Sequence, residues 1–183
     1  DLSGYPNHEV PVQYDATTGA KTYRDIVRYT GQLMGTNFRA ERLTGSLDVW
    51  KYGTSVTGTL FKRSRYDHTP SDYQCQFRGV EITSVKGTYK SVVNSANGTI
   101  MYIDDAPAWD YGTDAGLKAQ TLNLGNYVRQ LAYTPCEATI YSDPRYECGD
   151  LLTVVIDDDP THDIRILVTG FTWKFRNKCA IKS

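Results

Sequence analysis

The sequence lacks the features that would place it at once among membrane or polyanion-binding proteins. It contains no apolar run of the length that a membrane span needs, so we expect no membrane segment. Its formal net charge of −1 gives no general attraction to nucleic acid or to an anionic membrane. We therefore expect no sequence-specific nucleic acid binding, and 40% hydrophobic with 22% charged residues is typical of a globular domain.

Cysteine is scarce and its spacing is uninformative. The four cysteines make no CxxC pair, which argues against a zinc ribbon or a thioredoxin-like redox motif: Cys75, Cys136, Cys148 and Cys179. Because their number is even, two disulfides in a secreted protein remain open. We expect reduced, partly buried thiols, since four cysteines in 183 residues do not form a disulfide scaffold.

Histidine is also rare, and this bears on catalysis. His8, His68 and His162 each lie in a polar context outside any recognisable motif. Hydrolysis needs a nucleophile or an activated water together with a base. We therefore expect no enzyme activity, no catalytic residue, no metal and no cofactor.

Two segments have the spacing of helices. In 22–35, Thr22 followed by Asp25 has the form of a capping box, and Gly35 is placed to end the helix in the left-handed conformation. A second helix is predicted from about Asp114 to Leu131, with Asp114 as its cap. Its apolar positions fall at steps of four and three: Leu117, Thr121, Leu124, Val128 and Leu131.

Strands account for most of the remaining pattern, which predicts an α+β class with mainly antiparallel sheets. Residues 37–53 alternate on either side of Thr44 and Gly45 and predict a hairpin that turns at the glycine. The predicted organisation is an extended segment at 1–21, a helix and hairpin subdomain at 22–73, and a barrel-like β module at 74–183. The second helix, at about 114–131, is inserted in that module.

The stretch "SDPRYECGD" at 142–150 combines acids, an arginine and a cysteine. Pro144 biases Asp143 towards extended geometry, and Gly149 with Asp150 supplies a turn directly before an apolar strand. The residues Asp143, Pro144, Gly149 and Asp150 therefore predict a structural turn and not a catalytic or metal site.

The same stretch resembles the closing module of phage tail hub proteins, the family that includes tail-associated endopeptidases and lysins. The family pattern is "xGDPxxxxGDxVxV", introduced by a phrase similar to "YTPCEATIY" and followed by a strand similar to "ILVTGFTWKF". The segment "TYRDIVRYTGQLMGTNFRAERLTGSLDVWKY" also resembles the family's "YRDILxxIAxLxGxFARxxRxGxLxLxxY", and "FRGVEIT" its "ITGVxIT" strand. The resemblance runs over residues 16–183, and Ser142 stands where the family usually has glycine.

The resemblance implies a structural component of a phage or prophage tail hub, in the virion tail and assembled in the bacterial host cytoplasm. The implied partners are further hub copies, which form a trimer in the intact protein, the distal tail or tail tube protein, and the tape-measure protein. Full hubs begin with another barrel-like domain, so this chain, which starts at Asp1, resembles the later part of a hub. Some hubs cleave peptidoglycan, and the resemblance attributes that activity to additional domains.

Three further segments allow other interpretations. Trp109 lies beside Asp110 and Tyr111, and such a loop can contact a glycan or a neighbouring subunit, although packing of Trp109 against the sheet is the plainer account. A carbohydrate-binding module of a secreted or virion-surface protein is therefore the alternative function. The acidic run at 157–163 could attract a hard cation, and the basic and aromatic run at 61–66 is typical of single-strand binders, but a solvated loop and an exposed strand face explain them as well.

Overall fold

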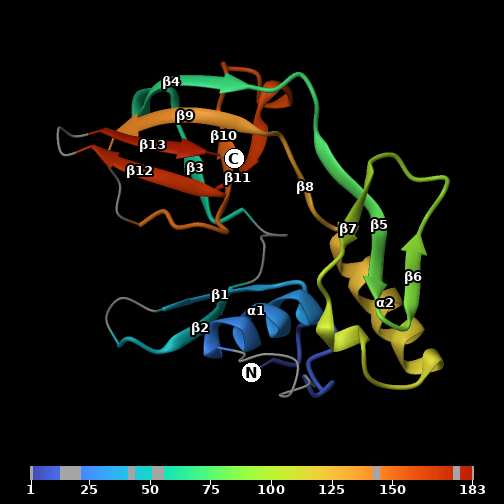
Figure 1. The fold of residues 1–183 in the computed structure, drawn as a ribbon. Helices are drawn as coiled ribbons and strands as arrows, with labels where there is room; N and C mark the ends of the chain where they lie inside the picture. Colours follow the sequence, from blue (N-terminus) through green and yellow to red (C-terminus); the bar gives the residue numbers. More distant parts are fainter. Residues whose placement is uncertain are drawn as a thin grey trace. The chain divides into compact units, whose positions relative to one another are not determined.

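The computed structural model describes residues 2–12, 22–40, 44–50, 56–141, 145–174 and 178–182 (Figure 1). It contains two α-helices and strands that pair mainly in antiparallel fashion, which confirms the predicted α+β class. Within these ranges the strands form open sheets, and none of the sheets closes into a barrel.

The chain divides into two compact units, and each unit is made of two separate segments. Unit 1 comprises Asp1–Lys51 and Phe77–Gln130, and unit 2 comprises Tyr52–Gln76 and Leu131–Ser183. This division differs from the predicted domains at 22–73 and 74–183, because the second helix shares a core with the first and not with the C-terminal strands. Local sequence signals do not show that two segments distant in the chain fold into one unit.

Helix α1, Tyr23–Met34, begins and ends where its local signals predict. The Thr22 hydroxyl accepts a hydrogen bond from the Asp25 N–H at 3.2 Å, and the Asp25 carboxylate accepts one from the Thr22 N–H at 2.9 Å. Gly35 follows the helix with φ 62°, in the left-handed region that glycine adopts without strain. The capping box and the glycine stop are therefore both confirmed.

The next two strands, β1 (Asn37–Ala40) and β2 (Leu47–Trp50), form the predicted antiparallel hairpin. Asn37 lies opposite Trp50 and Ala40 lies opposite Leu47. Gly45 has φ 70°, which explains why the connection contains a glycine at this position.

The rest of unit 1 is a sheet with a helix packed on it. Strand β5 (Cys75–Ser84) lies between β6 (Gly87–Val92), which is antiparallel to it, and β7 (Thr99–Ile103), which is parallel. A 3₁₀ turn, η2 (Pro107–Trp109), leads to helix α2, Asp114–Val128, which packs against β6. The helix ends three residues before the predicted Leu131, and its N-cap is Thr113 instead of Asp114, since the Thr113 hydroxyl accepts the Gly116 N–H at 3.2 Å.

The N-terminal segment differs from the extended conformation that its composition predicts. Residues 2–10 turn repeatedly, with hydrogen bonds from the Tyr5 N–H to the Leu2 carbonyl and from the Val10 N–H to the Asn7 carbonyl. The buried Asn7 amide donates to the carbonyls of Leu33 and Gln120, both at 3.0 Å. Because these carbonyls belong to α1 and α2, the segment is an integral part of unit 1.

Unit 2 consists of two sheets around one apolar core. The three-stranded sheet has the order β11-β10-β3, and the four-stranded sheet has the order β12-β13-β9-β4. The strands are β3 (Gly58–Leu60), β4 (Arg65–Pro70), β9 (Cys136–Tyr141), β10 (Leu151–Val154), β11 (Ile164–Leu167), β12 (Gly170–Lys174) and β13 (Lys178–Lys182). Short elements complete the unit: η1 (Lys62–Ser64), β8 (Ala132–Tyr133) and η3 (Pro160–His162).

Both sheets contribute to the core of unit 2, so each has one face turned inward. The three-stranded sheet supplies Leu60, Leu152, Val154 and Ile166, and the four-stranded sheet supplies Cys136, Ala138, Ile140 and Ile181. Along β9, buried and more exposed residues alternate strictly, as expected for a strand with one solvated face. The residues between the buried ones on β9 therefore lie on the face of the sheet that is turned away from the core of unit 2.

Candidate functional site

The Gly149–Asp150 turn is built from backbone contacts. Gly149 has φ 98°, in the region that L side chains rarely adopt, and the Asp150 side chain is buried. The Asp150 carboxylate accepts the Glu147 N–H at 2.8 Å, and the Asp150 N–H donates to the Glu147 carbonyl at 3.1 Å. Asp143 and Pro144, the other two residues of the predicted turn, lie outside the described residues.

The same turn also joins two strands. The Gly149 N–H donates to the Val168 carbonyl at 2.7 Å, and the Val168 N–H donates to the Asp150 carbonyl at 2.9 Å. These two bonds extend the antiparallel ladder in which Leu151 lies opposite Leu167. The Asp150 carboxylate thus fixes the local backbone at the start of β10.

The Trp109 loop does not offer the contact surface that its sequence suggests. The Trp109 side chain is 0% exposed, and its indole N–H donates to the Thr121 hydroxyl at 2.9 Å. A buried ring has no exposed face for a sugar or a neighbouring subunit, so this structure gives Trp109 the packing role, and a contact through Asp110 and Tyr111 stays a prediction. The Asp110 carboxylate accepts the Val85 N–H at 3.1 Å, and Tyr111 is partly buried.

The acidic loop at 157–163 is organised by its own hydrogen bonds. Asp159 caps η3 by accepting the Thr161 N–H at 2.9 Å, and Asp157 accepts the Asp159 N–H at 2.8 Å and the His162 Nδ1–H at 2.7 Å. These hydrogen bonds, with that from His162 the strongest, lower the pKa of the Asp157 carboxyl below its usual value. The loop is exposed and its carboxylates already accept protein donors.

The basic and aromatic run at 61–66 has partners for two of its charges. The Lys62 ammonium pairs with Asp158 at 3.2 Å, and the Arg63 guanidinium lies 5.5 Å from the centre of the Phe61 ring. Both contacts compete with the phosphate and base contacts that a single-strand binder makes.

The described residues contain neither a metal-binding cluster nor a membrane-spanning helix. No three His, Cys, Asp or Glu side chains in these ranges lie close enough together to hold a metal ion. No helix in the same ranges is both long and apolar enough to cross a lipid bilayer.

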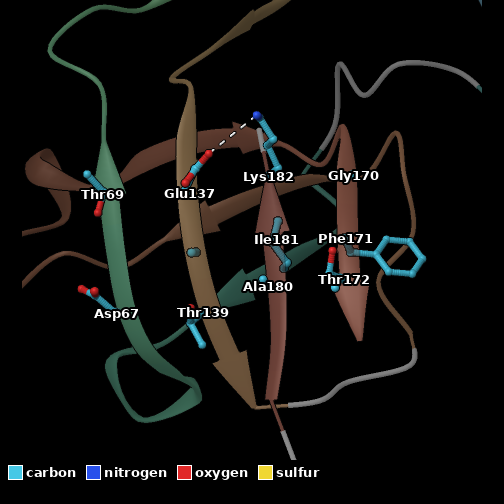
Figure 2. A pocket seen from close by; sticks show the side chains of 11 residues that line it. Asp67, Thr69, Glu137, Thr139, Gly170, Phe171, Thr172, Ala180, Ile181 and Lys182 are labelled. Carbon is cyan, nitrogen blue, oxygen red and sulfur yellow. Dashed lines mark ion pairs between the residues drawn. The ribbon is translucent and has the colours of Figure 1, made fainter. Parts of the chain in front are cut away.

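The structure has a hollow that sequence reasoning missed, on the outward face of the four-stranded sheet of unit 2 (Figure 2). Its volume is about 490 Å³. Strand register places two cross-strand rows of residues there, Thr69, Glu137, Lys182 and Gly170 in one and Asp67, Thr139, Ala180 and Thr172 in the other. In the first row the Lys182 ammonium pairs with the Glu137 carboxylate at 3.7 Å.

Alternation along β9 gives a partial signal for this face, because Glu137 and Thr139 fall between buried residues. It does not reveal the neighbouring strands. β4 and β13 lie more than a hundred residues apart in the chain, and only the folded register brings Asp67 and Ala180 into one row with Thr139.

Comparison with known proteins gives matches at the level of structure. No family model matches the chain, and no curated protein matches it. Solved structures of phage tail components are similar to it. One is the 43 kDa tail protein of prophage MuSo2 from Shewanella oneidensis, with 12% identity over 93% of this chain and 54% of that chain and a TM-score of 0.45.

A second similar structure is the phage P2 baseplate in its activated conformation with Ca. It shares 6% identity over 93% of this chain and 55% of that chain, with a TM-score of 0.26. The chain therefore spans about half the length of each of these two proteins.

Proposed function

We propose that this chain is a structural, non-enzymatic module of a phage or prophage tail hub, which joins the tail tube to the tip by ring assembly. The observation that carries the proposal is the correspondence between the hub-like motifs and local structure. The segment at 22–52 that resembles the family's helix and hairpin contains α1, β1 and β2, and the segment "FRGVEIT" lies in β5. The segments that resemble the family's closing module contain β9, β10, β11 and β12, in the order in which the family has them.

The geometry of the Gly149–Asp150 pair supports a structural use of the most specific motif. Glycine is needed there because φ is 98°, and a short carboxylate is needed because it accepts the Glu147 N–H within the same turn. Both requirements concern the backbone. Neither residue needs a substrate to explain its presence.

The contacts of two of the three histidines, His8 and His162, support the non-enzymatic part of the proposal. His8 Nδ1 lies 2.8 Å from the Tyr5 carbonyl oxygen, and His162 bonds to Asp157 in an exposed loop. A catalytic base must lie within reach of a nucleophile or a bound water in a site that excludes solvent. These two loops are exposed and provide no such enclosure.

The partners in this proposal are further hub copies, the distal tail or tail tube protein and the tape-measure protein. In a ring each contact joins two different surfaces of neighbouring copies, so the assembly relies on large complementary interfaces and on no reacting residue.

Mass spectrometry of purified phage particles tests the proposal. Particles from the strain that encodes the chain are treated with nuclease and protease, separated on a density gradient and digested. Peptides from residues 22–183 should accompany those of the other tail proteins at a fixed ratio across the gradient. Their absence from particles, together with their presence in the particle-free fraction, would reject a virion role.

A further inference from the structure

The loop at 93–98 joins β6 to β7 and ends in an asparagine followed by a glycine, Asn97 and Gly98. Because β6 and β7 pair with opposite sides of β5, the loop leads from one side of that strand to the other (Figure 1). Its first residue is held by a hydrogen bond from the Val93 N–H to the Arg78 carbonyl at 2.9 Å. Asn97 and Gly98 lie at the far end of the loop, directly before β7 begins.

Both residues of this pair are exposed. The side-chain amide of Asn97 makes no hydrogen bond with any residue that the structure describes. No turn or loop hydrogen bond among the described residues uses the Gly98 N–H as its donor. Gly98 has φ 110°, a conformation that residues with a side chain rarely adopt. Solvent therefore reaches the Asn97 amide and the Gly98 backbone, and the hydrogen bonds of the described fold occupy neither.

Asn97 and Gly98 carry the groups for an intramolecular reaction. The Gly98 backbone nitrogen, after it loses its proton to hydroxide, attacks the side-chain amide carbon of Asn97. A bond forms between that nitrogen and Cγ, the bond from Cγ to the side-chain nitrogen breaks, and ammonia leaves, which gives a succinimide ring. Water then opens the ring at one of its two C–N bonds and leaves aspartate or isoaspartate at position 97. We propose that Asn97 is a site of this spontaneous deamidation.

Other asparagines of the chain lack one or more of these features. Asn123 and Asn126 lie within helix α2, where the N–H of the following residue donates to a carbonyl one turn earlier and is not free to attack. The Asn7 side chain is buried and donates two hydrogen bonds. Asn94 is the closest comparison, because it is exposed in the same loop. It is followed by Ser95, whose side chain crowds the attacking nitrogen and narrows the backbone angles, whereas glycine does neither.

The products differ from asparagine in charge and in main-chain length. Either product adds a carboxyl group that is ionised at neutral pH. In isoaspartate the main chain runs through the side-chain carbon, so the connection to β7 becomes longer by one methylene group. The change lies next to a strand that unit 1 uses, since Met101 and Ile103 of β7 pack against its core. This inference is independent of the proposed role in the tail hub, because it concerns only the chemistry of two neighbouring residues.

Ageing of the purified chain in mildly alkaline buffer, followed by digestion at acidic pH and mass spectrometry of the peptides, tests the proposal. Electron-transfer fragmentation distinguishes aspartate from isoaspartate. Asn97 should convert several-fold faster than Asn94, and faster as the pH rises, because the attacking nitrogen must lose its proton. Asn97→Gln should abolish conversion at this position, since the longer side chain would have to close a larger ring. Ser95→Gly should raise the conversion rate of Asn94 towards that of Asn97.

A synthetic peptide that covers residues 92–100 gives the rate for the same pair with no fold around it. Circular dichroism shows that the chain remains folded while it ages. The folded chain should convert Asn97 at a rate close to that of the peptide, because the end of the loop is exposed and makes no hydrogen bond that blocks the reaction. A much slower rate in the folded chain would show that the loop holds the Gly98 nitrogen away from the Asn97 amide and would overturn the proposal. So would equal rates at Asn97 and Asn94 in the folded chain.

Discussion

Gly125 of helix α2 lies directly against Ser91 of strand β6. A Cβ atom placed on Gly125 would come within 2.7 Å of the Ser91 Cβ and 3.0 Å of the Ser91 carbonyl oxygen, closer than real contacts allow. The helix therefore approaches the sheet through a position that has no side chain. Unit 1 depends on this approach, because Leu124 and Val128 of the same helix belong to its core.

This contact predicts an unusual outcome for a glycine in a helix. Replacing glycine by alanine inside a helix normally stabilises it by about 0.5–1 kcal/mol. In Gly125→Ala the clash with Ser91 should outweigh that gain, since overpacking costs about 1–3 kcal/mol. Urea unfolding should show a lower midpoint for Gly125→Ala and a smaller decrease, or none, for Gly116→Ala in the same helix, where the added Cβ meets only the Thr113 hydroxyl oxygen, at 3.2 Å. Equal effects of the two changes would contradict the close packing.

The turn before β10 should be intolerant of branched side chains. Gly149 has φ 98°, and backbone strain of this kind costs about 1–3 kcal/mol when an L side chain is forced into it. Gly149→Val should therefore lower the free energy of unfolding by about that amount. Gly4→Ala is a suitable control, because no atom lies within 4 Å of its added Cβ. An unfolding midpoint of Gly149→Val equal to that of wild type would show that the turn relaxes freely.

Strand register bears on the state of the cysteines. Cys179 lies opposite Ile140 on β9, and Cys136 is four residues away along that strand, a separation of about 13 Å. A disulfide needs Cα atoms within about 7 Å, so these two residues do not form one. Alkylation under denaturing, non-reducing conditions should modify four cysteines if the chain is assembled in a reducing cytoplasm, as the proposed function implies. Under native conditions exposed Cys148 should react first. Two protected pairs would indicate secretion.

The Asp157–His162 hydrogen bond predicts a defined pH dependence. The folded-state pKa of Asp157 lies below its usual value of 3.8, so the loop contact adds stability above that pH and loses it as the pH falls through the lowered pKa. In His162→Ala the titration midpoint of the Asp157 carboxyl, followed by NMR, should move up towards 3.8. Asp159, whose pKa is lowered by the Thr161 N–H and hydroxyl, should keep its midpoint. A downward shift of the Asp157 midpoint, or a shift of the Asp159 midpoint larger than that of Asp157, would refute the assigned cause.

The elements that sequence reasoning found are those whose signals are local. Thr22, Asp25 and Gly35 contact only their own helix, and Gly45 needs only its own turn, so each could be recognised without knowledge of the fold. Leu131 continues the helical spacing but lies beyond α2, because a periodic apolar residue can also be buried in a loop.

The elements that sequence reasoning missed depend on distant partners. The environment of Trp109 is decided by Thr121, a residue of the following helix, and by the core around them. The hollow needs Asp67 and Ala180 on either side of Thr139, although they are more than a hundred residues apart in the chain. A surface formed by strands in this order is visible only after folding.

The position of the protein in the particle is the most direct test of the central claim, that this chain is part of a tail hub. Antibodies against residues 22–183 are bound to intact particles and to detergent-opened particles, labelled with gold and viewed by electron microscopy. Our account predicts label at one end of the tail tube, at the tip, in most opened particles. Label along the whole tube, on the head or on no particle would contradict it.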